Sequence, residues 1–148
     1  MRFRRLSIGL TCAFLLSLGP GLARPHAQGT SQPQSVQLPA GAATLEGIPT
    51  VRIDTSQKGA RRKVLTAAEA KQDRLMINKV GGQYFWANRE NKPLQLNSSG
   101  PYTYLSAEPG SYVRLTRIND RIDYVEHLDS PLGSVTWWGE LRIVVGKP

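Results

Sequence analysis

The chain has 148 residues, with 19 Lys or Arg against 11 Asp or Glu, a formal net charge of +8 and one cysteine. A single cysteine excludes a disulfide framework and a zinc site built from several thiolates.

Residues 1–23 have the pattern of a secretory signal peptide. Three arginines precede residues 6–18, which are uncharged and largely apolar, and small residues at Leu22-Ala23 form a cleavage site. A retained membrane anchor is the alternative, but a spanning helix needs about 20 apolar residues. We expect cleavage here, or at a second site near Ala27, and export to the periplasm or the extracellular space.

Cleavage changes the composition of the exported chain. About 125 residues remain, which suits one domain. Three arginines leave with the signal, so the basic residues fall from 19 to 16 against 11 acidic ones, and Cys12 is removed. The mature protein would be mildly basic and cysteine-free, with no disulfide, no thiolate metal ligand and no thiol nucleophile.

Residues 24–62 have the composition of a flexible linker, with many Pro, Gln, Ser, Gly and Ala residues. Within them, residues 50–54 alternate like a short strand. The densest basic cluster, Arg61-Arg62-Lys63, predicts either a weak contact with an anionic surface or a solvated flank. Three charges without interleaved aromatic residues do not make a nucleic-acid footprint, so no nucleic acid is expected as a partner.

A short helix is expected near the start of the domain, which would span residues 63–148. Thr66 and Glu69 have the spacing of a capping box, in which each side chain bonds to the backbone N–H of the other residue. We expect the helix to run over residues 67–74 and to cover part of the fold.

From residue 75 the apolar residues recur with a period of two. Turn signals such as Gly81-Gly82 and Asn119-Asp120 separate the segments. The expected strands are 75–80, 83–89, 94–97, 102–107, 111–118, 121–128, 134–138 and 141–145. Short strands at this regular spacing predict a mainly β fold, a small antiparallel sandwich or barrel preceded by one short capped helix. The nearly continuous apolar run at 141–145 predicts a central last strand.

A two-residue turn at Asn119-Asp120 fixes the register of its hairpin. One face would carry the core residues Val113, Leu115, Ile122 and Tyr124, and the other Tyr112, Arg114, Thr116, Asp123 and His127. One hypothesis makes His127 a general base positioned by Asp123, with Arg114 binding an anionic substrate. The other is a solvated sheet face with cross-strand charge pairs.

Aromatic side chains give a second lead. Tyr84 and Trp86 point to the same side of one strand, and an exposed pair there would stack on sugar rings or on a peptide. The alternative is that both are buried. Trp137 and Trp138 point to opposite faces of another strand, so at most one of them belongs in the core.

No catalytic or cofactor motif stands out. Phosphate-loop, dinucleotide and nucleophile-elbow motifs are missing, and His127, the one histidine of the expected domain, with dispersed carboxylates does not predict a metal site. We therefore expect no cofactor and an exported, non-enzymatic binding or structural module of the cell envelope. Its partner would be a glycan or a protein, without a transmembrane segment after signal removal. The expected ligand-binding residues are Tyr84, Trp86, Tyr112, Arg114 and His127. A small hydrolase or lyase using His127, Asp123 and Arg114 is the alternative.

Overall fold

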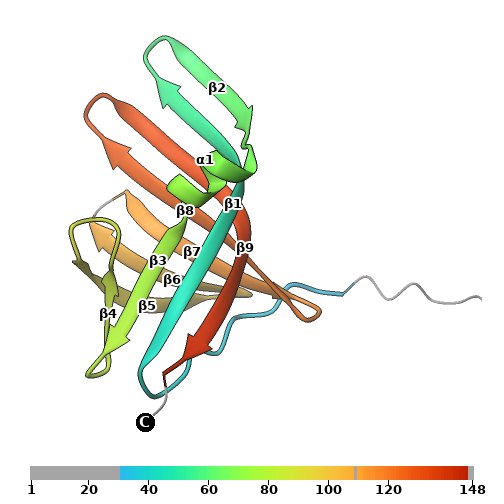
Figure 1. Ribbon diagram of the computed structural model, residues 1–148, viewed down its shortest axis with the longest axis vertical. Helices are drawn as coiled ribbons and strands as arrows, with labels where there is room; N and C mark the ends of the chain where they lie inside the picture. Colours follow the sequence, from blue (N-terminus) through green and yellow to red (C-terminus); the bar gives the residue numbers. More distant parts are fainter. Residues whose placement is uncertain (1–30, 109, 147–148) are drawn as a thin grey trace, which may run out of the picture.

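The protein is an eight-stranded antiparallel barrel with one extra strand and one short helix. The computed structural model describes residues 31–108 and 110–146, so the expected signal peptide and Cys12 lie outside the described residues. Neighbouring strands follow the order β2-β1-β3-β4-β5-β6-β7-β8-β9, and pairing of β1 with β9 closes the barrel (Figure 1). The prediction of a mainly β fold, a small antiparallel barrel with one short helix, is confirmed. The helix does not precede the barrel, however, because it follows β1 and β2 in the chain.

The described elements follow the chain without long connections. Their bounds are β1 Ala43–Ser56, β2 Gly59–Val64, α1 Ala67–Gln72, β3 Leu75–Val80, β4 Gln83–Trp86, β5 Lys92–Ser99, β6 Tyr102–Glu108, β7 Ser111–Ile118, β8 Arg121–Ser130 and β9 Gly133–Val145. All strand pairs are antiparallel, which matches their short loops.

The structure corrects the linker prediction for residues 43–62, because they form β1 and most of β2. Ala43 and Leu45 alternate with partly exposed residues and face the core. Small residues and Pro49 hide this period-two pattern in the sequence. Every side chain of β2 is exposed, so this strand has no apolar face to recognise and is held mainly by its backbone pairing with β1.

Parts of β1, β8 and β9 extend beyond the end of the barrel, together with β2. β3 pairs with β1 only as far as Gly47, and β7 pairs with β8 only as far as His127. Past these points β2, β1, β9 and β8 remain paired and form the extension, residues 51–64 and 128–138, which stands above the barrel in Figure 1. The extension forms one wall of the barrel mouth.

The capping box at the start of α1 is confirmed. The Thr66 hydroxyl accepts from the backbone N–H of Glu69, and the Glu69 carboxylate accepts from the backbone N–H of Thr66. Lys63 and these contacts with Thr66 lower the pKa of Glu69 to about 2. The helix ends at Gln72, two residues earlier than predicted, because Asp73 adopts a non-helical capping conformation.

Both predicted two-residue turns are present. Gly81 and Gly82 have φ values of 58° and 84°, which suit the primed turn that joins twisted strands. The turn at Asn119-Asp120 sets the predicted register, with Tyr112 opposite His127. Val113, Leu115, Ile122 and Tyr124 are accordingly buried, as expected from that register.

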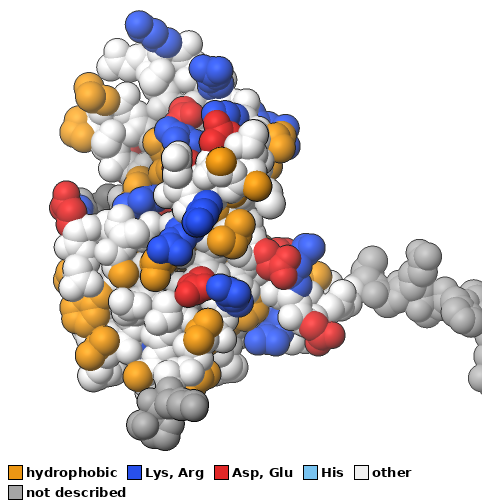
Figure 2. Space-filling view, in the orientation of Figure 1, with side chains coloured by type: hydrophobic (Ala, Val, Ile, Leu, Met, Phe, Trp, Pro, Cys, Tyr) orange, Lys and Arg blue, Asp and Glu red, His pale blue; other side chains and the backbone are white. Residues whose placement is uncertain are grey.

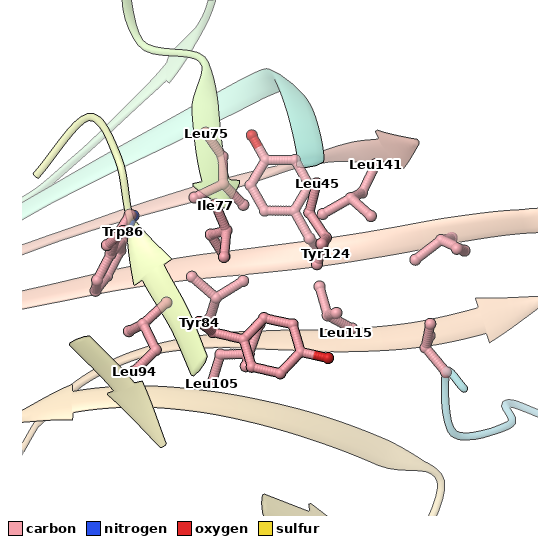
Figure 3. Packing of buried hydrophobic residues seen from close by; sticks show 13 residues of the cluster. Leu45, Leu75, Ile77, Tyr84, Trp86, Leu94, Leu105, Leu115, Tyr124 and Leu141 are labelled. Carbon is pink, nitrogen blue, oxygen red and sulfur yellow. The ribbon is translucent and has the colours of Figure 1, made fainter. Parts of the chain in front are cut away.

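The core fills the barrel interior. Alternate residues of eight strands point inward and meet there, including the two large side chains Trp86 and Tyr124 (Figure 3). The buried cluster consists of Val36, Leu45, Leu75, Ile77, Tyr84, Trp86, Leu94, Leu105, Val113, Leu115, Ile122, Tyr124 and Leu141. Eight-stranded barrels have an interior that side chains can fill or that can hold one small ligand, and here side chains fill it.

The last strand differs from its prediction in length and burial. Residues 134–138 and 141–145, expected as two strands, form the single strand β9 through Gly139. β9 does lie between two neighbours, β8 and β1. Its end is nevertheless not fully enclosed, since Val144 and Val145 are 46% and 63% exposed.

Candidate ligand-binding cavity at the barrel mouth

A cavity of about 480 Å³ opens at the barrel mouth beside the extension. Its walls come from the 87–91 loop, the inward side of β6 and β7, and the β8–β9 hairpin. It is lined by Trp86, Asn88, Arg89, Glu90, Lys92, Ala107, Ser111, Leu128, Asp129, Ser130, Gly133 and Val135. A volume of this size suits a small molecule.

Trp86 forms part of the cavity floor. It ends β4, points into the barrel and is 1% exposed. Its indole Nε1–H is buried and makes no well-aligned hydrogen bond within the described residues. It nevertheless helps to stabilise the charged form of the Glu126 carboxylate.

Glu126 lies next to this floor as a charged residue in a core position. It faces inward from β8 and is fully buried. Arg89 Nη2 lies 3.0 Å from Glu126 Oε1 and pairs with it. Neither carboxylate oxygen accepts a well-aligned hydrogen bond from the described part of the chain, and Arg89 Nε–H is likewise unsatisfied. The pair is held together by charge more than by hydrogen-bond geometry.

Burial raises the pKa of Glu126 to about 7. The low-dielectric surroundings disfavour the charged carboxylate, and the positive charge of Arg89 opposes this effect. Near neutral pH the carboxyl group therefore exchanges between its protonated and ionised forms. Protonation weakens its hold on Arg89, which lines the cavity.

The loop that carries Arg89 is fixed by Asn88. The Asn88 side-chain oxygen accepts from the backbone N–H of Met76 at 3.1 Å, and its side-chain N–H donates to the carbonyl of Arg74. Glu90 and Asn91 adopt left-handed backbone conformations, with φ of 57° and 53°. These contacts place Arg89 over the barrel mouth independently of any ligand.

Trp137 connects the cavity to the helix end. The guanidinium of Arg89 lies 5.1 Å from its ring centroid, and that of Arg52 lies 5.4 Å from it. Its indole Nε1–H donates to Asp73 Oδ2 at 2.9 Å. Arg52 in turn bonds to Asp54 at 2.7 Å, so the extension and α1 are tied to the mouth through one polar network.

The structure contradicts the exposed aromatic platform. Tyr84 and Trp86 do share a side of β4, but that side is the barrel interior, and both are buried. Tyr84 packs in the core, whereas Trp86 reaches the cavity. Trp137 is buried and Trp138 is partly exposed on the other face, as predicted.

The predicted polar face lies on the outside of the barrel, but its residues do not form a catalytic set. His127 stacks on Tyr112 with ring centroids 5.2 Å apart, and its Nδ1 lies 2.8 Å from Thr136 Oγ1. Asp123 pairs instead with Arg121 at 2.8 Å. Four residues of one strand separate Asp123 from His127, about 13 Å, so the carboxylate does not position the imidazole. Arg114 lies over the Tyr102 ring at 4.7 Å.

Arg61, Arg62 and Lys63 lie on β2, the edge strand of the extension. All three are exposed, and Lys63 pairs with Glu69. Figure 2 shows basic side chains at this end of the molecule. Lysine and arginine on an edge strand also discourage pairing with another sheet.

Neither a membrane-spanning helix nor a metal-binding cluster is found within residues 31–108 and 110–146. No helix in this part of the chain is long and apolar enough to cross a membrane. No group of three or more His, Cys, Asp and Glu side chains there could hold a metal ion.

Glu126 and Arg89 were missed as site residues by the sequence analysis. A signal for Glu126 was present, because it has the same strand parity as Ile122 and Tyr124, which were assigned to the core. A charged residue at an inward position is rarely buried unless it is paired. Arg89 gave no such signal, since its loop position depends on tertiary contacts.

No protein-family model matches the chain, and comparison with curated proteins and solved structures finds none that is similar to it.

Proposed function

We propose that the protein is an exported, non-enzymatic module that binds a small molecule in the cavity at its barrel mouth. The observation that supports this most is the cavity of about 480 Å³ itself, whose lining combines an apolar wall with charged side chains. A cavity of this size with a mixed lining is typical of small-molecule sites.

The cavity lining also indicates the chemistry of the ligand. Ala107, Leu128 and Val135 give one part an apolar wall. Arg89 and Lys92 bring positive charge, and Glu90 and Asp129 bring negative charge. A ligand with an apolar body and a carboxylate or carbonyl head would bury its body against the wall and accept from Arg89 or Lys92. Octanoate is a simple probe of this class.

The experiment is calorimetric titration of octanoate into the protein and into two variants. In Ala107→Phe the larger side chain fills the cavity, so binding should weaken by at least about tenfold. Ala60→Phe makes the same change on exposed β2, away from the cavity, and should bind as the wild type does. Equal binding by both variants, or no binding to the wild type, would contradict the proposal.

Export is supported by the three arginines and the apolar residues 6–18 at the N-terminus. N-terminal sequencing of the protein from the producing cells tests it, since a mature chain beginning near residue 24 is expected. A chain that retains residue 1 in the cytoplasm would refute export.

A weak contact of Arg61, Arg62 and Lys63 with anionic surfaces stays a prediction. The hydrolase or lyase hypothesis has no support from the distances around His127.

A further inference from the structure

A second hollow lies on the outer surface of the barrel, away from the mouth. It has a volume of about 450 Å³ and runs across β7, β8 and β9, with Tyr102 at one side. None of its lining residues lines the mouth cavity. We call it the outer groove, and its main side chains are Tyr102, Arg114, Asp123, Trp138 and Glu140.

Strand register places its side chains in rows. Arg114, Val125 and Trp138 stand opposite one another across β7, β8 and β9. A second row consists of Thr116, Asp123 and Glu140. Since these residues alternate with buried ones, both rows face outward.

Aromatic residues lie near both ends of the groove. Trp138 is partly exposed on β9, and Tyr102 lies on β6 under the guanidinium of Arg114, two residues before Tyr104, which stands opposite Arg114. Three strand intervals of about 5 Å each separate β6 from β9. The rings are thus too far apart to pack on each other, and a molecule that touches both must be elongated.

The second row supplies paired hydrogen-bonding groups. Arg121 Nη2 donates a hydrogen bond to Asp123 Oδ2 at 3.1 Å. Asp123 stands opposite Glu140, which is exposed. Two carboxylates and two guanidinium groups therefore lie along the groove with opposite charges close together. Such a lining offers several donors and acceptors without a strong net charge.

We propose that the outer groove binds a neutral oligosaccharide. Pyranose rings with equatorial hydroxyl groups expose apolar C–H faces that stack on aromatic rings, here Trp138. At the other end, Arg114 already lies over the Tyr102 ring, so this pair offers the guanidinium group to a ligand. Sugar hydroxyl groups donate to carboxylates such as Asp123 and Glu140 and accept from Arg114. A polyanion would gain little from a lining whose charges balance, and an apolar peptide would leave the charged groups desolvated. A neutral polyhydroxylated chain satisfies both kinds of surface.

The test is calorimetric titration of cellohexaose and chitohexaose into the full protein and its variants. We expect at least one of the two to bind, and Trp138→Ala and Tyr102→Ala each to weaken that binding by about tenfold or more, since aromatic anchors carry much of the energy of such sites. Phe85→Ala removes an aromatic residue from the outer side of β4, outside the groove, and serves as the matched control.

Folding of each variant is checked by its thermal unfolding. If Trp138→Ala fails to fold, Arg114→Gln and Tyr102→Ala test the groove, because both side chains are only partly buried. The proposal would be overturned if neither sugar, titrated to about 10 mM, bound with an affinity of about 1 mM or tighter. It would also be overturned if Phe85→Ala weakened binding as much as the groove variants do.

Discussion

Glu126 is the residue whose surroundings differ most from what its side chain prefers. It is fully buried beside Arg89, with no aligned hydrogen bond from the described residues. Replacing such a pair by apolar residues often leaves stability unchanged or raises it, so the pair is poorly explained by folding alone. A role in presenting Arg89 to a ligand explains its position better.

The buried carboxyl group makes stability depend on pH. The pKa of Glu126 is about 7 in the folded protein, above its ordinary value of 4.5. Between these two pKa values the folded state binds the Glu126 proton more strongly than the unfolded state does. The free energy of unfolding therefore falls as the pH rises from 5 to 8. We expect a loss on the order of 3 kcal/mol from this residue, with the Glu126→Gln variant lacking it.

Urea unfolding at pH 5 and pH 8 measures this effect. The difference in unfolding free energy between wild type and Glu126→Gln isolates the residue, because other titrating groups cancel. Glu140→Gln, an exposed change on β9, is the control and should keep the wild-type pH dependence. A Glu126→Gln protein that loses as much stability as the wild type would show that the carboxyl group is not perturbed.

At the scale of elements, β9 closes the barrel by pairing with β1, and it is also the strand that was wrongly predicted as two. Gly139 interrupts its alternating pattern, which is why the sequence suggested two strands. In the structure this glycine is a close approach of β1 to β9, since an added Cβ would lie 2.1 Å from the backbone oxygen of Ile48. The break in the pattern marks a close approach and not a turn.

Gly139→Ala tests this close approach. The added methyl group meets backbone and not a movable side chain, so β1 and β9 must separate locally. We expect a destabilisation of about 3 kcal/mol in urea unfolding. Gly41→Ala is the control, because nothing lies within 4 Å of its added Cβ. It should change stability by no more than about 0.5 kcal/mol, and equal effects of the two changes would refute this reading of β9.

At the scale of the whole molecule, period-two patterns and turn residues predicted the β fold and the hairpin register correctly. They failed for β1 and β2, where small residues or full exposure remove the apolar alternation. The cavity was beyond sequence reasoning for a physical reason. It joins Trp86, Arg89 and the β8–β9 hairpin, and only closure of the barrel brings these distant segments together.

The two proposed sites can be distinguished through the tryptophans. The chain has three, at positions 86, 137 and 138, and each gives one indole N–H signal in a two-dimensional nitrogen–proton spectrum. Trp86 lines the mouth cavity and Trp138 lines the outer groove. Single Trp→Phe variants assign the signals.

Titration of octanoate while these signals are recorded is the most direct test of the proposed function. We predict that the Trp86 signal shifts with saturation, because its indole lines the cavity, while the Trp138 signal stays in place. An unchanged Trp86 signal at saturating octanoate, or a shift of Trp138 alone, would contradict ligand binding in the barrel mouth.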